Sequence, residues 1–335
     1  MKQYIKDRFN TAILAEVMQR YAIAPDKITA LDGFESFIYE FERAGADYIL
    51  RITHTERRNE NLIHGEVDWI NYLAAGGAGV SQAILSENGQ LVEKVPAGHG
   101  EHFLATAFTK APGKPPWEIG WTPEIYVNYG RLLGHIHALS KQYTPGDPAW
   151  QRMQWDDPVM LDIEANLPAT ESKALGEFHK IITHIKTLPK DPAGFGLIHF
   201  DAHPGNMFAT ADGQLTLFDF DDCCYGWYIY DIAMVLFYNV MDAWEDGNEA
   251  EFTRNFMTHF LNGYTQETEL APKWLKKLPW FLKLREVDLY ALIHRDFDLD
   301  DLDEWCTRYM CGRKYRIENN IPYIDFDFET LVELL

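Results

Sequence analysis

The sequence has no apolar run long enough to span a bilayer, and its first 21 residues are charged throughout. We therefore expect neither a membrane protein nor a secreted one, and predict a cytoplasmic location. Cysteine is also scarce, and its four residues match neither a zinc site nor a disulfide framework: Cys223, Cys224, Cys306 and Cys311. We expect reduced thiols that fill space in the core.

Basic residues are too few for a nucleic-acid binder. The sequence holds 30 lysines and arginines against 51 acidic residues, a formal net charge of −21, whereas nucleic acids require a basic face. The acidic excess suits a cationic partner, although a solvated acidic surface would give the same charge. Repeats are absent, and 47% hydrophobic and 14% aromatic residues predict one or two packed domains.

One segment, Leu197–Asp222, concentrates the polar residues that can carry chemistry. A His-x-Asp sequence followed five residues later by Asn is the layout of a phosphotransferase catalytic loop. In that layout Asp201 accepts the proton of the attacking hydroxyl, Asn206 holds Mg²⁺, and the later Asp219 is the principal metal ligand. We assign Asp221 to a second metal ion or its bound water.

Two other interpretations of this segment stay open. His199, Asp201 and His203 could form the metal cluster of a hydrolase, with Asp219 as a distant ligand. Short Asp-rich turns could also be solvated loops without chemistry. A phosphotransferase is favoured, because a hydrolase would not need Asn206 together with a strand that ends in Asp-Phe-Asp.

The motif His199-Phe-Asp201-Ala-His203-Pro-Gly-Asn206, followed by Asp219-Phe-Asp221, resembles the aminoglycoside phosphotransferase and choline kinase-like family. The resemblance implies an α+β, two-lobed protein-kinase-like fold and activity mostly on small molecules. Its N-lobe (residues 1–109) would be an antiparallel sheet with a helix that binds nucleotide. Its larger, mostly helical C-lobe (residues 110–335) would hold the catalytic loop, metal site and acceptor site. The family's usual pattern has a small residue or Asn where Phe200 stands.

The hydrophobic pattern predicts helices over residues 11–23, 60–75 and 123–142, and over much of 158–187 and 248–335. It predicts strands at residues 28–34, 36–43, 47–53, 80–86, 91–95, 103–109, 197–200 and 215–220. The Pro- and Gly-rich stretch 110–116 is typical of a lobe boundary, and 144–157 of a surface loop.

The nucleotide site is expected in the N-terminal strands. Only Gly33 lies at the first turn, so a glycine-rich loop is absent and the backbone around Ser36 would have to cover the phosphates. Adenine should hydrogen-bond to backbone groups near Ala107 and Thr109, since such contacts are made by main chain and leave little trace in the sequence.

Arg51 lies on the third predicted strand, where kinase folds carry a phosphate-binding lysine, and a guanidinium can grip phosphate oxygens in pairs. The resemblance implies that Glu66, in the following helix, pairs with Arg51 and orients it. Asp68 is the alternative partner.

Supporting residues are expected around the catalytic loop. In the family an Asp at the position of Asp231 braces this loop by accepting backbone hydrogen bonds, although a helix cap is an alternative role. We place His199 and His203 in the same supporting layer.

The stretch Arg295–Trp305 is dense in carboxylates. Leu299 and Leu302 at helical spacing favour a solvated helix, whereas carboxylates beside Trp305 could instead hold an ammonium group in the acceptor site. We expect at least one of four aspartates to face the cleft near Asp201: Asp296, Asp298, Asp300 and Asp301.

Together these patterns predict an ATP- and Mg²⁺-dependent phosphotransferase that acts on a hydroxyl of a small, amine-bearing molecule. Aminoglycosides, amino alcohols and hydroxy amino acids are the candidate acceptors, and neither nucleic acid nor membrane is an expected partner. A Ser/Thr protein kinase of the same family and a non-catalytic nucleotide-binding scaffold are the alternatives. Only a few residues separate Asp221 from the next helix, which leaves no Ala-Pro-Glu-type activation segment and favours a small acceptor.

Overall fold

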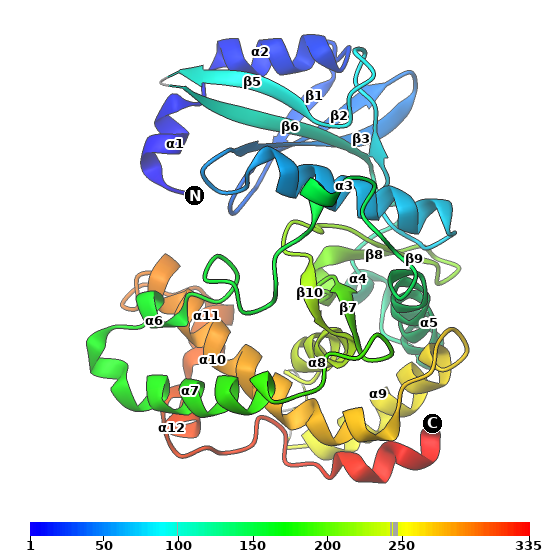
Figure 1. Cartoon of the computed structure of the whole chain (residues 1–335), viewed down its shortest axis with the longest axis vertical. Helices are drawn as coiled ribbons and strands as arrows, with labels where there is room; N and C mark the ends of the chain where they lie inside the picture. The colour runs from blue at the N-terminus through cyan, green and yellow to red at the C-terminus, as the bar shows by residue number, and fades with distance from the viewer. Residues whose placement is uncertain (99, 242, 244–246) are drawn as a thin grey trace. The chain divides into compact units, whose positions relative to one another are not determined.

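The computed structural model describes residues 1–98, 100–241, 243 and 247–335 (Figure 1). The chain forms two compact units. The first comprises Met1–Lys114, Gln142–Arg152 and Met207–Asp221, and the second comprises Pro115–Lys141, Met153–Asn206 and Asp222–Leu335. None of the helices in the described ranges is long and apolar enough to cross a membrane.

The first unit is built on an antiparallel sheet with the strand order β1-β2-β3-β6-β4, and β5 also pairs with β6. Its strands are β1 (Ile28–Leu31), β2 (Phe37–Arg43), β3 (Ala46–His54), β4 (Ala83–Ile84), β5 (Glu93–Gly98) and β6 (Glu101–Thr109). Its helices are α1 (Gln3–Arg8), α2 (Thr11–Arg20) and α3 (Glu60–Ala75), with α2 on one face of the sheet and α3 on the other (Figure 1).

Helix α3 begins and ends where its sequence requires. The side chain of Asn59 accepts a hydrogen bond from the backbone N–H of Leu62, which satisfies one of the donors that a helix start leaves open. Its apolar residues recur every three or four positions and form one buried face: Ile63, Val67, Ile70 and Leu73. The predicted bounds of this helix are therefore confirmed.

A hairpin of β8 (Met207–Ala209) and β9 (Leu215–Leu217) completes the first unit. Lys114 pairs with Ala209 through two backbone hydrogen bonds and extends the hairpin. Gly113 has φ +92°, and a Cβ there would lie 2.0 Å from the carbonyl oxygen of Ala209, so only glycine permits this approach. The prediction of one strand over 215–220 is wrong beyond Leu217, and the pattern did not reveal β8.

The second unit is mainly helical. Its helices are α4 (Pro116–Ile119), α5 (Pro123–Ser140), α6 (Ile163–Asn166), α7 (Ser172–Lys186), α8 (Tyr228–Asn239), α9 (Glu249–Tyr264), α10 (Leu278–Asp296), α11 (Glu304–Met310) and α12 (Arg313–Glu318). Its strands β7 (Phe195–Ile198) and β10 (Cys224–Trp227) form an antiparallel pair. Helix α8 is apolar almost all round and is buried in the core.

Three further predictions need correction. The loop 144–157 is not simply a surface loop, because Arg152 and Trp155 are buried. The helix over 158–187 is interrupted between α6 and α7, where Pro168 cannot donate a backbone hydrogen bond. The acidic stretch is not one helix, since α10 ends at Asp296 and α11 begins at Glu304.

Candidate active site

The catalytic loop follows β7 in the second unit, and Asp231 in the first turn of α8 holds its backbone. The Asp231 carboxylate accepts hydrogen bonds from the backbone N–H of His199 at 2.9 Å and of Phe200 at 2.7 Å. Phe200 has φ +73°, a conformation that bulky residues rarely adopt. The N-cap of α8 is Trp227, so Asp231 does not have the alternative role of helix cap.

His137 of α5 also contacts Asp231 and helps to orient it. Its Nε2 lies 3.1 Å from Asp231 Oδ2, and its Nδ1 lies 2.8 Å from the hydroxyl of Tyr264. Burial lowers the pKa of His137, although Asp231 acts to raise it. A neutral imidazole that donates from Nε2 and accepts from the tyrosine satisfies both contacts. The loop that precedes Asp201 is thus fixed by a fully buried polar chain.

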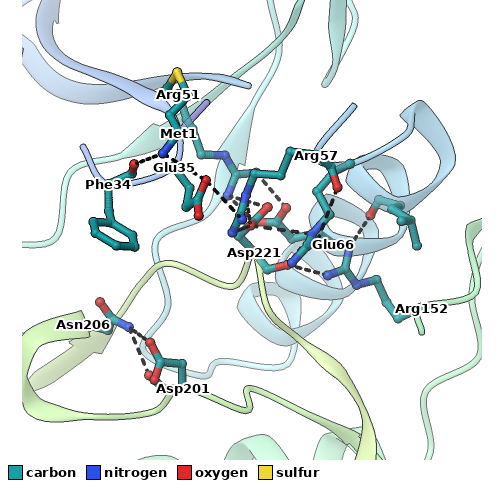
Figure 2. Close-up of polar contacts among 12 residues, drawn as sticks. Met1, Phe34, Glu35, Arg51, Arg57, Glu66, Arg152, Asp201, Asn206 and Asp221 are labelled. Carbon is teal, nitrogen blue, oxygen red and sulfur yellow. Dashed lines mark hydrogen bonds and ion pairs between the residues drawn. The ribbon is translucent and has the colours of Figure 1, made fainter. Parts of the chain in front are cut away.

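Three side chains position the carboxylate of Asp201 (Figure 2 shows its contact with Asn206). Asn206 Nδ2 donates to Oδ2 at 3.2 Å and to the backbone carbonyl of Asp201 at 3.0 Å. His203 Nε2 lies 3.4 Å from Oδ2, and Arg285 Nη2 donates to Oδ1 at 3.2 Å. Burial alone would raise the pKa of Asp201, but His203 and Arg285 outweigh it and hold the pKa well below its usual value. Asp201 is therefore ionised, which is the state that its predicted role as proton acceptor requires, and that role stays a prediction.

Arg285 is the residue of this site that sequence analysis missed. It lies on α10, is buried, and donates to Asp288 Oδ2 at 2.7 Å and to the hydroxyl of Tyr238 at 2.6 Å. Burial raises the pKa of Asp288, and the Arg285 guanidinium opposes this. The available signal was an Arg and an Asp three residues apart on a helix that carries a second such pair, Lys283 and Glu286, among buried apolar residues.

In the first unit, Arg51 and Glu66 form a paired contact between β3 and α3. Arg51 Nη1 donates to Glu66 Oε1 at 2.8 Å, and Nη2 donates to Oε2 at 2.6 Å (Figure 2). Burial acts to lower the pKa of Arg51, but Glu66 more than compensates and raises it. Asp68, the alternative partner, instead accepts hydrogen bonds from the Tyr143 hydroxyl at 2.6 Å and the Gly146 N–H at 3.0 Å.

Arginines surround Asp221 in the same unit (Figure 2). Arg57 donates to Asp221 Oδ2 from Nε at 3.1 Å and from Nη2 at 2.6 Å. Arg152 Nη2 donates to the backbone carbonyl of Asp221 at 2.5 Å, and Arg58 Nε lies 3.6 Å from Oδ2. Burial would raise the pKa of Asp221, but these cations hold it far below the usual value. A role of Asp221 as a metal ligand stays a prediction. In the structure its carboxylate is the anion of a cluster of arginines.

The remaining predicted nucleotide and metal residues are placed as follows. Asp219 follows β9, is exposed, and has φ +62°, which non-glycine residues adopt mainly where the surroundings enforce it. Ser36 is buried and directly precedes β2. Ala107 pairs with Leu50 and Ile84, and Thr109 N–H donates to Gln82, so both adenine positions already have partners within the sheet. Their roles stay predictions.

The acidic stretch is exposed at all four predicted positions. Asp296 accepts two hydrogen bonds from Arg295, and Asp298 accepts one from the backbone N–H of Asp300. These contacts are local, and a role of the stretch in acceptor binding stays a prediction. Within the described residues, no three His, Cys, Asp or Glu side chains are grouped to hold a metal ion.

We expect Arg51→Ala to weaken ATP binding or slow turnover, and Glu66→Ala to do the same through Arg51. Because the two side chains share both of their hydrogen bonds, the double variant should lose little beyond either single one. The measurement is a double-mutant cycle on kcat and the KM for ATP. Strictly additive effects would show that the pair is not coupled in function.

An ionised Asp on a braced loop, and a strand arginine paired with a helix glutamate, are features of a kinase-type phosphotransferase. The chain belongs to the phosphotransferase enzyme family, whose model matches residues 27–272. A relative similar over nearly all of its length is the amicoumacin kinase of Bacillus subtilis (strain 168). It is 38% identical over 324 residues, which cover 96% of this chain and 95% of that protein.

Solved structures agree with this assignment. Amicoumacin kinase hAmiN, in complex with AMP-PNP, Ca²⁺ and Ami, superposes with a TM-score of 0.93 at 36% identity, covering 99% of this chain and 100% of that one. A microcompartment-associated aminopropanol kinase gives a TM-score of 0.68 at 21% identity over 93% and 98% of the two chains, which supports the fold alone. The predicted family, protein-kinase-like fold and small-molecule kinase class are therefore confirmed.

Proposed function

We propose that this chain transfers the γ-phosphoryl group of ATP, with Mg²⁺, to a hydroxyl group of a small amine-bearing molecule. The arrangement of Asp201 carries the proposal. Its carboxylate is ionised, oriented by Asn206 and Arg285, and still one-quarter exposed, with a side-chain accessibility of 24%. An acceptor hydroxyl can therefore reach it, and proton transfer to such a positioned base contributes about 10²- to 10⁴-fold to rate.

The other residues would act by position and charge. ATP with its divalent metal ion supplies the phosphoryl group, and AMP-PNP with Ca²⁺ in the hAmiN structure supports this pair of cofactors. Asn206 and Asp219 would hold the metal: the Asn206 amide nitrogen donates to Asp201, so its oxygen remains for the ion, and both residues offer the hard oxygen atoms that Mg²⁺ prefers. Arg51, oriented by Glu66, would neutralise charge on the α and β phosphates.

Amicoumacin is the first acceptor to test, because two similar proteins carry it in their names. The experiment is a screen for ATP consumption with Mg²⁺, using amicoumacin, amino alcohols, hydroxy amino acids, aminoglycosides and sugars. We expect one class to accelerate consumption and to yield a phosphate ester detectable by mass spectrometry. Consumption that no acceptor stimulates would contradict the proposal, and turnover of phosphate esters without ATP would favour a hydrolase.

Asp219→Ala is expected to abolish Mg²⁺-dependent turnover and to leave the fold intact. The residue is exposed, and alanine removes an oxygen ligand that the metal requires. Acceptor-dependent ATP consumption is the readout, with circular dichroism to verify folding. Asp212→Ala, an exposed Asp in the β8–β9 turn, is the matched control and should keep wild-type activity. Activity near wild type in Asp219→Ala would remove this residue from the metal site.

A further inference from the structure

The segment Gln142–Arg152, called the strap below, follows α5 in the sequence but belongs to the first unit, where it packs on α3. The ring of Trp150 stacks on His64 of α3 with centroids 5.1 Å apart. A Cβ at Gly65 would lie 2.0 Å from the carbonyl oxygen of Trp150, so only glycine permits this approach. Asp68 binds the other end of the strap through the two hydrogen bonds described above. The strap is therefore held along α3 by packing, close backbone contact and hydrogen bonds.

Arg152, the last residue of the strap, is buried and bridges two backbone carbonyls of the first unit. Its Nη1 donates to the carbonyl of Leu62 at 2.7 Å, and its Nη2 donates to that of Asp221 at 2.5 Å (Figure 2). Arg58 Nε reaches the carbonyl of Asp221 only at 3.4 Å. A planar guanidinium suits such a bridge, because two hydrogen bonds from its rigid fork fix its orientation. Arg152 thus joins α3 to the end of the Asp-Phe-Asp segment.

The first carbonyl lies one helical turn before Glu66. In α3 the carbonyl of Leu62 accepts the N–H of Glu66, four residues further on, and it accepts Nη1 of Arg152 in addition. Glu66 holds the guanidinium of Arg51 through two hydrogen bonds. The position of this turn of α3 therefore determines where Arg51 points.

The second carbonyl ends the segment that carries the predicted metal ligand. Asp219 has φ +62°, a conformation that its surroundings have to maintain. The next residue, Phe220, is buried and packs on Trp69 of α3 with ring centroids 5.3 Å apart. Arg152 then fixes the carbonyl of Asp221. The backbone that presents Asp219 is thus anchored to α3 and to the strap.

We propose that Arg152 is a positioning residue for phosphoryl transfer, which holds Glu66 and Asp219 in one arrangement by joining the backbone next to each. This inference rests on the proposed function for the roles of those two side chains. Loss of a residue that orients a metal ligand typically lowers metal affinity or activity about 10- to 100-fold. The effect of removing Arg152 should therefore appear in nucleotide binding that depends on the metal ion.

The first test follows backbone hydrogen exchange in the full chain without nucleotide or metal. Arg152→Ala should accelerate exchange in two segments, residues 62–69 and 215–221, and leave strands β3 and β6 unchanged. Arg20→Ala is the matched control: Arg20 also donates to a backbone carbonyl, but from α2 on the other face of the sheet (Figure 1), and should change neither segment. Faster exchange in one segment alone, or equally throughout the first unit, would overturn the proposal.

The second test measures AMP-PNP binding by calorimetry, with Mg²⁺ and with EDTA, well below the unfolding midpoint of each variant. Arg152→Ala should weaken binding about 10- to 100-fold with Mg²⁺ and much less with EDTA. A general loss of stability would not produce this difference, and Arg20→Ala should keep both affinities. Equal weakening under the two conditions, or unchanged binding with Mg²⁺, would refute the positioning role.

Gly65→Ala tests the strap without changing Arg152. Alanine favours a helix, but its Cβ would push α3 away from the carbonyl of Trp150, so this variant should also lose affinity for AMP-PNP with Mg²⁺. Gly176→Ala in α7, where an added Cβ meets no atom within 4 Å, is the control and should bind as wild type does. If Arg152→Ala does not fold, Gly65→Ala decides, and wild-type affinity in it would contradict the inference. If wild type binds AMP-PNP but phosphorylates no acceptor, the proposed function fails, and these binding measurements still decide this inference.

Discussion

Asp201→Asn is expected to lower kcat by about 10²- to 10⁴-fold, the usual contribution of a positioned general base, and to change both KM values little. Asparagine keeps an oxygen for Arg285 and fits the same volume, but it cannot accept the proton of the acceptor hydroxyl. The loop should keep its conformation, since Asp231 binds the backbone of residues 199 and 200 and does not depend on the Asp201 side chain.

Steady-state kinetics with the acceptor varied, and a thermal unfolding midpoint as a control for folding, measure this effect. His203→Gln is a useful comparison, because it removes the weaker 3.4 Å contact to the carboxylate and should reduce kcat far less. If Asp201→Asn kept more than a tenth of wild-type kcat, Asp201 would orient the acceptor without serving as its base.

Asp221→Ala is expected to destabilise the protein by about 3–5 kcal/mol, the typical cost of removing one partner of a buried ion pair. The carboxylate is buried, accepts two hydrogen bonds from Arg57, and lies within 4 Å of charged atoms of Arg51 and Arg58. Without it these guanidinium groups repel one another with no anion between them. Asp221→Asn should be intermediate, because it keeps an acceptor and loses the charge.

Urea unfolding without nucleotide and without divalent metal measures this effect independently of any role in catalysis. Glu42→Ala is the matched control in the same unit: its pair with Lys27 is exposed on both sides, and such pairs contribute little to stability. A loss below about 1 kcal/mol in Asp221→Ala, together with loss of turnover, would instead support the predicted metal role.

The family resemblance, which short motifs carry, was enough to predict the residues that the chain brings together over short distances. The catalytic loop and Asp231 lie within one stretch of the sequence, and the Arg51–Glu66 pair joins an adjacent strand and helix. Arg285 and Arg57 could not be found in this way. They reach their carboxylates across 84 and 164 residues, and each is an ordinary helix or loop residue until tertiary packing supplies its partner.

The prediction of secondary structure was wrong where pairing with distant segments determines the strand. Strand β8 is only three residues long and becomes a strand by pairing with β9 and Lys114, which propensity does not encode. The predicted strand 80–86 reduces to Ala83–Ile84 for the same reason, since its edges find no continuous partner in the described sheet. Arg152 was predicted to lie in a surface loop. Its burial depends on backbone acceptors at Leu62 and Asp221, which the local sequence does not show.

The strained backbone at Phe200 also limits which residues can replace it. Its positive φ costs about 1–2 kcal/mol relative to an unstrained residue, which asparagine would largely relieve. The buried ring, however, packs at 4.7 Å from Tyr230, and removing such a ring costs about 3–5 kcal/mol. A single step to asparagine, one of the residues that the family resemblance implies here, would therefore be a net loss. Asparagine would be tolerated here only together with a larger neighbour that fills the space, so the packing of the ring holds the strained backbone in place.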